Sequence, residues 1–182
     1  MMKTLFPVLL ILLLSCETTE KKTGLFEDLA DKTSLEIYLK TYGLDSVPKD
    51  IGQLKAARRL YIAKDSARGW TIYPPLSALD QRTQLPPFRQ LPDEITELTN
   101  LESLVLSDLD LKTLPSNFGR LQNLDSLSLF MNKLTLSAEL GKLKALKKLK
   151  YLEIYGNKAD STDLEELKKA IPGLTIYNGD IE

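Results

Sequence analysis

The chain contains no histidine, and its only cysteine is Cys16. Histidine is the usual proton carrier near neutral pH and a common metal ligand, and a thiolate is the other frequent nucleophile and soft ligand. Histidine-based triads, Cys/His dyads and the usual zinc sites are therefore excluded. A disulfide within the chain is excluded too, so we expect stability to come from packing alone.

Glycine-rich loops and blocks of one charge are also missing. The 9 glycines are scattered along the chain, so they form no phosphate-binding loop. The 24 basic and 25 acidic residues are interspersed and leave a net charge of −1, so no basic stripe indicates a nucleic-acid partner. With 182 residues, 43% of them hydrophobic, the chain has the size and composition of one packed domain.

A short apolar segment occupies the N-terminus. Lys3 precedes an apolar run from Leu5 to Leu14. This run is too short to cross about 30 Å of hydrocarbon as a helix, which needs about 20 residues, but it is typical of a cleaved secretory signal. The run ends in LLSC at residues 13–16, which resembles the lipobox of bacterial lipoproteins. The resemblance implies cleavage before Cys16 and acylation of that cysteine; the alternatives are an ordinary signal peptide and a buried N-terminal helix.

These features predict three segments and a location. Residues 1–15 are expected to be a lipoprotein signal peptide, residues 16–24 an acylated cysteine with a flexible polar tether, and residues 25–182 the folded domain. Two or more acyl chains, such as palmitate, hold a protein stably on a membrane. We therefore expect a lipoprotein of the bacterial cell envelope, anchored preferably to the outer membrane and either periplasmic or surface-exposed.

A repeat fills most of the remaining chain. Three stretches align in one register: VPKDIGQLKAARRLYI from Val47, LPDEITELTNLESLVL from Leu91 and LPSNFGRLQNLDSLSL from Leu114. LDSLSLFMNKL from Leu124 and LKYLEIYGNKA from Leu149 then follow the pattern Leu-x-x-Leu-x-Leu-x-x-Asn-x-Leu, the latter ending in alanine. The chain thus resembles the leucine-rich repeat family, with units of about 23 residues. This resemblance implies a right-handed α/β solenoid of about six units, with short parallel strands on its concave face and caps at both ends.

The alternation within each unit predicts which residues are buried. Two leucines separated by one residue point to the same side of a strand, and stacked strands then share a continuous core. We expect the central strand residues to be Ile37, Leu60, Thr83, Leu104, Leu127, Leu152 and Leu174. The returning segments are expected to build a second apolar wall from Ile51, Ile95, Phe118 and Leu140.

The asparagine position and the ends of the repeat carry further expectations. In this family the asparagine turns its amide inward, and here Asn132 and Asn157 occupy its position as a structural ladder. Earlier units have Tyr42, Asp65, Phe88 and Leu109 there, so we expect their bends to be satisfied differently. The unit at residues 79–91 is the poorest match, because Pro86-Pro87 opposes a regular ladder. Residues 25–32 are expected to form a capping helix, and Thr162-x-x-Glu165 a capping box before a helix over residues 164–170.

Residues that alternate with the buried leucines form the predicted ligand-binding face. Five of the 7 tyrosines of the chain fall on it, together with Phe130. Tyrosine buries a large area at low entropic cost, which favours binding; it also simply favours strands, and the two interpretations weigh equally. The candidate ligand-binding residues are Tyr38, Tyr61, Phe130, Tyr151, Glu153, Tyr155 and Tyr177. We expect the group from Phe130 onward to be the principal contact patch.

The same face argues against catalysis. Its only acids, Glu36 and Glu153, lie five units apart, whereas glycoside hydrolysis needs two carboxylates about 5–10 Å apart. No catalytic residue, metal site or cofactor is predicted. We expect a monomeric, non-enzymatic protein that binds an unknown protein ligand, contacts a membrane only through acyl chains on Cys16, and binds no nucleic acid. The alternatives are a surface adhesin and a carbohydrate-binding envelope module that stacks sugars on its aromatic side chains.

Overall fold

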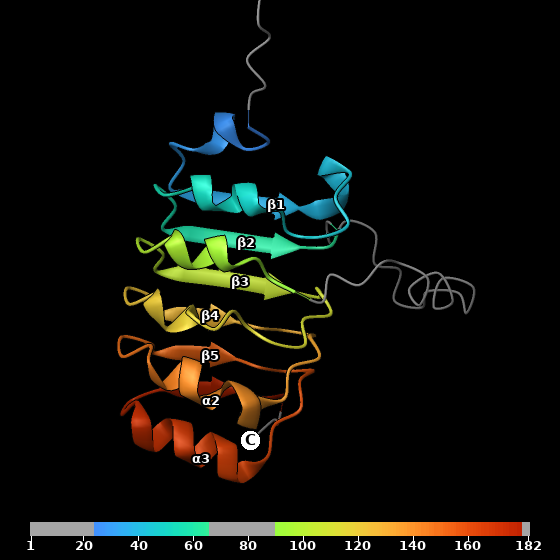
Figure 1. Cartoon of the computed structure of the whole chain (residues 1–182). Coiled ribbons are helices and arrows are strands. Elements are labelled where there is room, and N and C mark those ends of the chain that lie inside the picture. The colour runs from blue at the N-terminus through green and yellow to red at the C-terminus, as the bar shows by residue number, and fades with distance from the viewer. Residues whose placement is uncertain (1–23, 66–89, 180–182) are drawn as a thin grey trace, which may run out of the picture.

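The chain forms one parallel sheet that is covered on a single side (Figure 1). The computed structural model describes residues 24–65 and 90–179. Six strands follow one another in chain order and are all parallel: β1 (Ser34–Tyr38), β2 (Arg59–Ala63), β3 (Ser103–Ser107), β4 (Ser126–Ser128), β5 (Tyr151–Glu153) and β6 (Thr175–Tyr177). Neighbours in sequence are therefore also neighbours in the sheet, as a solenoid requires.

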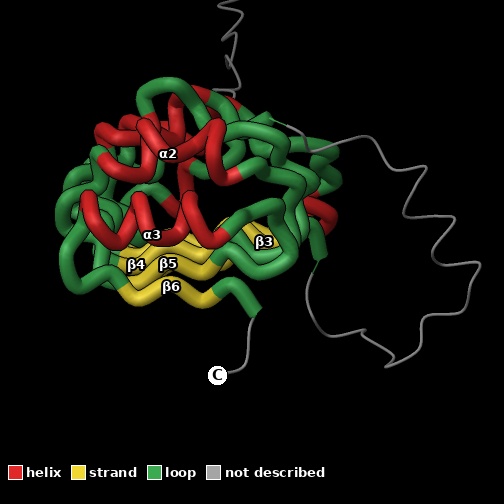
Figure 2. Tube along the Cα trace, turned by 90° about the horizontal axis from the view of Figure 1, so that it is seen from below, coloured by secondary structure: helices red, strands yellow, loops and turns green. Residues whose placement is uncertain are grey.

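Most helical segments lie on one side of this sheet. They are the 3₁₀ turns η1 (Glu27–Leu29), η3 (Lys49–Gln53), η4 (Asp93–Glu97) and η5 (Phe118–Arg120), and the helices α2 (Leu136–Lys144) and α3 (Ser161–Ala170). The turn η2 (Leu39–Tyr42) directly follows β1 and lies beyond its end. Seen end-on, the strands form one layer and the helices the other, and no described helix covers the opposite side of the strands (Figure 2). No helix in the described ranges combines the length and apolarity needed to span a bilayer. This arrangement confirms the predicted α/β leucine-rich-repeat solenoid, and we call its uncovered side the open face.

The register of the sheet confirms most central residues and corrects two. Leu60 pairs with Leu104, and Leu127 pairs with Leu152, as expected. The first strand, however, aligns Leu35 with Leu60, and the last aligns Ile176 with Leu152, so the expected centres Ile37 and Leu174 were wrong by two positions. Alternation has a period of two, so a shift of two residues leaves every side chain on the same face and the sequence does not reveal it.

The strand expected around Thr83 is not between its neighbours. β2 pairs directly with β3, with Tyr61 opposite Val105. Arg58 and Glu102, which occupy equivalent places in these two units, are 44 positions apart, close to two repeat lengths. The regular repeat length therefore predicted a strand between β2 and β3, where the sheet has none. Thr83 itself lies outside the described residues, as do Pro86, Pro87 and Phe88 of the same expected unit.

The second apolar wall is built from one position in each unit. The residue nine positions before the central strand residue is 0% exposed throughout: Ile51, Ile95, Phe118, Leu143 and Leu167. Leu140, expected in this column, is 9% exposed and gives its place to Leu143. The fourth returning segment is a full α-helix rather than a 3₁₀ turn, so counting forward from its start misses the equivalent residue.

Both ends of the solenoid differ from the expected caps. At the N-terminus only the turn η1 forms, with Phe26 fully buried and Leu25 exposed. At the C-terminus α3 begins at Ser161, and its N-cap is Asp160, whose Oδ1 accepts a hydrogen bond from the Asp163 N–H at 2.8 Å. The predicted capping box at Thr162 was therefore two residues late, because the aspartate carboxylate caps a helix as well as a hydroxyl does.

The bends after the strands are held by asparagine only in the C-terminal half. Oδ1 of Asn132 accepts hydrogen bonds from the N–H groups of Leu109 and Leu111 at 3.1 and 3.2 Å, and its amide donates to the carbonyl of Leu106 at 2.8 Å. Asn157 repeats this one unit later by accepting from the Leu134 N–H at 3.0 Å. Each asparagine thus satisfies backbone groups of the preceding bend, including that of buried Leu109.

The first two units use an ion pair at the same place. The residue at the asparagine position of the first unit is Lys40, not Tyr42 as expected, because the first strand is shifted by two. Its Nζ lies 2.8 Å from Oδ2 of Asp65, which holds the position in the second unit. Both side chains are about half exposed, so this pair contributes little to stability compared with the buried amides.

We predict that Asn132→Ala lowers the free energy of unfolding by about 2–4 kcal/mol, because it leaves more than one buried backbone group without a partner. Chemical denaturation measures the change. Asn123→Ala is the matched control: the Asn123 amide donates to the Thr99 carbonyl at 2.9 Å on an exposed edge, and its loss should cost about 0.5 kcal/mol. Equal costs for the two variants would contradict a special role for the buried amide.

Candidate binding face

Residues that alternate with the buried leucines do reach the open face. Tyr151 and Tyr155 are 38% and 42% exposed, whereas Leu152 and Ile154 between them are 0% and 3% exposed. The parallel register arranges such residues in rows across the sheet. The central row consists of Glu36, Tyr61, Val105, Ser128, Glu153 and Tyr177. This register brings together side chains that are far apart in the sequence.

Four aromatic side chains gather at the C-terminal end of this face, and we call them the C-terminal aromatic patch: Phe130, Tyr151, Tyr155 and Tyr177. The rings of Phe130 and Tyr155 stack, with centroids 5.6 Å apart and an interplanar angle of 24°. The ring centroids of Tyr155 and Tyr177 are 6.4 Å apart. The three tyrosines each remain about two-fifths exposed, so much ring surface still faces solvent.

Glu153 lies inside this patch. It ends β5, two residues after Tyr151 and two residues before Tyr155 in the following turn, and its Cα pairs with those of Ser128 and Tyr177 on the adjacent strands. The Ser128 hydroxyl donates to Oε2 of Glu153 at 2.6 Å. Over residues 24–65 and 90–179, no lysine or arginine forms an ion pair with this half-buried carboxylate.

A second, smaller aromatic pair lies at the N-terminal end of the face. The rings of Tyr38 and Tyr61 are 5.8 Å apart and tilted by 57°. The Tyr38 hydroxyl donates to Oε2 of Glu36 at 2.9 Å. Serines and a valine on β3 and β4 separate this pair from the C-terminal patch. The seven candidate residues therefore form two groups rather than one continuous site.

The expected separation of the two acids holds in the structure. Glu36 lies on β1 and Glu153 on β5, with three strands between them. Asp108 and Asp110 both adopt left-handed backbone conformations in the bend after β3, and Oδ1 of Asp110 lies 2.7 Å from Nζ of Lys133. Within the described ranges, no group of three metal-ligating side chains comes together. Glu36 and Glu153 therefore do not form the close carboxylate pair that glycoside hydrolysis needs.

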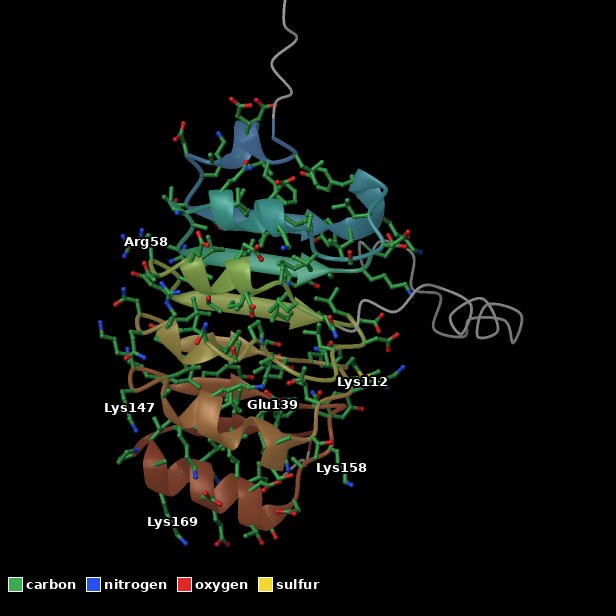
Figure 3. All side chains as sticks on the ribbon, viewed as in Figure 1. Arg58, Lys112, Glu139, Lys147, Lys158 and Lys169 are labelled. Atoms are coloured by element: carbon green, nitrogen blue, oxygen red, sulfur yellow. The ribbon has the colours of Figure 1, made fainter. Side chains whose placement is uncertain are left out.

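Several polar residues that the sequence did not single out hold the returning segments. Glu139 is 1% exposed, and its two oxygens accept hydrogen bonds from the Thr113 hydroxyl at 2.9 Å and the Leu114 N–H at 3.1 Å. Lys142 pairs with it at 2.8 Å and also donates to the Leu114 carbonyl. In Figure 3, Glu139 lies within the body of the solenoid, whereas Lys158 projects from one edge. No sequence pattern marks this pair of a buried glutamate and a partly exposed lysine.

A second amide ladder runs along the opposite edge, from which Arg58 and Lys147 project (Figure 3). Asn100 and Asn123 donate to backbone carbonyls of the preceding units at 2.8 and 2.9 Å. Arg58 and Glu102 form a hydrogen-bonded ion pair on this edge. The two asparagines occupy the same place in consecutive repeats, so the aligned repeat contained the signal that would have found them.

The chain is similar to several solved structures of bacterial proteins. A leucine-rich-repeat protein of Leptospira interrogans is 32% identical over 83% of this chain and 38% of its own, with a TM-score of 0.49. Two internalins of Listeria monocytogenes are 22% and 21% identical, cover 74% and 83% of this chain and 38% and 63% of theirs, and have TM-scores of 0.45 and 0.49. No protein-family model and no curated protein matches.

The chain spans less than two-thirds of the length of each of these three structures. The strand register and the stacked apolar columns, both observed in this chain itself, therefore define the fold. The leucine-rich-repeat solenoid is the fold. Which ligand the face binds must be argued from its own side chains.

The environment of Tyr151 leads to a prediction about its ionisation. Burial is the main cause that raises the pKa of the Tyr151 phenol above its ordinary value, followed by the negative charge of Glu153 and by Tyr177. We expect Glu153→Gln to lower this pKa while leaving it above the ordinary value, because burial remains. Titration of the ring carbon signals by NMR measures both values, with Glu36→Gln as the control. An unchanged pKa in Glu153→Gln would contradict the placement of the carboxylate.

Proposed function

We propose that this chain is a non-enzymatic, protein-binding leucine-rich-repeat protein of the bacterial cell envelope. The C-terminal aromatic patch is its principal contact surface, and the Tyr38–Tyr61 pair is a secondary one. In this function the protein acts as a monomer, with the ligand on its open face. The proposal uses no cofactor, metal ion or nucleic acid.

The observation that carries the proposal is the gathering of four aromatic rings on a sheet face that no described helix covers. Each such ring offers a large contact area, and aromatic side chains supply many of the residues that dominate protein interfaces. Stacking of Phe130 on Tyr155 holds these two rings before a ligand arrives, so less side-chain entropy is lost on binding. Part of the patch is therefore preorganised for binding as well as exposed.

We predict that simultaneous replacement of Phe130, Tyr151 and Tyr155 by alanine abolishes partner binding. Loss of two or more residues that each contribute about 2 kcal/mol weakens binding at least ~100-fold. In-cell crosslinking followed by mass spectrometry should then no longer detect the crosslinked partner. The free energy of thermal unfolding should change by about 1 kcal/mol or less, mainly because the ring stack is lost.

The matched control for this experiment is Tyr38→Ala with Tyr61→Ala, which removes the other aromatic pair of the same face. This variant should keep most of the crosslinked partner. Undiminished crosslinking in the triple variant would reject the patch as the contact surface. Binding of the wild-type chain to a glycan array, together with no crosslinked protein, would favour a carbohydrate-binding module instead.

The envelope location rests on the N-terminal pattern, which lies outside the described residues. We predict that Cys16→Ser moves the protein from the membrane pellet to the soluble fraction of a diderm bacterium, because the residue that carries the acyl chains is lost. Incorporation of labelled palmitate should disappear in the same variant. Continued sedimentation with the membrane would reject the lipid anchor. Protease shaving of intact cells separates a surface adhesin, which is removed, from a periplasmic protein, which is protected.

A further inference from the structure

We propose that the C-terminal aromatic patch accepts a basic side chain of the partner, preferably arginine, with its charge at Glu153 and its apolar stem against the surrounding tyrosines. This inference rests on the proposed function and specifies its chemistry. Glu153 and the rings of Tyr151, Tyr155 and Tyr177 form the subsite.

The first observation is a carboxylate without a cation. Some other acids of the described chain do have ionic partners: Glu102 pairs with Arg58, and Glu139 with Lys142. Glu153 accepts one hydrogen bond from the Ser128 hydroxyl on Oε2, and no ion pair forms with it in the described ranges. A ligand that covers the patch removes water from this carboxylate. That removal is costly unless the ligand supplies a cation or a donor in return.

The second observation is the aromatic frame. Tyr151 precedes and Tyr155 follows Glu153 on the same side of the chain, and Tyr177 stands beside it on the next strand. The faces of tyrosine rings attract cations, and arginine in particular stacks on them. The planar guanidinium also donates two hydrogen bonds to one carboxylate, whereas an ammonium acts as a point charge. Carboxylate and rings therefore select the same kind of side chain.

The third observation is that, in the described part of the chain, no basic residue occupies the strand positions that pair with those of Glu153 and its row neighbours. The neighbours of Glu153 in the rows of the open face are serines, threonine, valine and tyrosines. The negative charge of Glu153 contributes to the raised pKa of Tyr151, so its field reaches into the patch. An acidic partner residue would be repelled here, and a purely apolar one would leave the carboxylate buried and unpaired. The other acid of the face, Glu36, also accepts one hydroxyl hydrogen bond, from Tyr38, but lies on β1, away from the C-terminal aromatic patch.

The test uses two small probes on the mature chain, a capped Gly-Arg-Gly tripeptide and the same peptide with citrulline in place of arginine. Citrulline keeps the shape and planarity of the side chain but carries no charge. NMR titration follows the ring signals of Tyr151, Tyr155 and Tyr177. We expect the arginine probe to shift these signals and to bind roughly fivefold more tightly than the citrulline probe.

Two variants make the result decisive. Glu153→Gln keeps the acceptor for Ser128 and should bring the two probes to within about twofold of each other, while Glu36→Gln should leave the preference for arginine unchanged. Equal binding of the two probes to the wild-type chain, or an equal preference in Glu153→Gln, overturns the inference. The proposed function is judged separately: loss of the crosslinked partner in the triple alanine variant upholds it even when the preference for arginine is absent.

Discussion

Parallel pairing of one short strand per unit is the constraint on which the rest of this structure depends. A single strand of three to five residues buries its leucines only against the next unit, so every unit is held by its neighbours. The row from Leu35 to Ile176 and the column from Ile51 to Leu167 are the two apolar seams of this stack. Apart from the partly exposed Ile176 at the C-terminal end, both seams are buried, so the helical layer and the sheet share one core.

The same pairing creates the open face and separates the residues that pack in the core from those that face solvent. Because leucines occupy one side of each strand, the residues between them do not pack in the core and lie in straight rows across the other side of the sheet. Rows place Glu153 beside Tyr177, although a whole helix separates them in sequence. A binding surface thus arises from residues that individually resemble ordinary strand residues, and its chemistry depends on what the register brings side by side.

Most polar side chains inside the stack satisfy backbone groups, unlike those on the open face. Bends between units expose backbone N–H and C=O groups to the core, and these need partners. Asn132 and Asn157 supply them in the C-terminal half, whereas Glu139 with Lys142 serves the turn before η5. In the first two units the asparagine position carries the Lys40–Asp65 ion pair near the surface. The repeat pattern could predict the asparagines, but the buried Glu139 arises only from the way α2 packs on the preceding turn.

The sequence by itself determined the α/β solenoid, the sides of its strands and the composition of the open face, because alternation has a period of two and burial follows from it. It did not determine which leucine is central in the end strands, since Leu35 and Ile37 satisfy the pattern equally. The tertiary structure decided that β2 meets β3 directly, since hydrogen bonding between neighbours, not regular spacing, sets the order. It also decided that Glu153 stands within an aromatic frame without a cation, because only pairing of separate units places those side chains together.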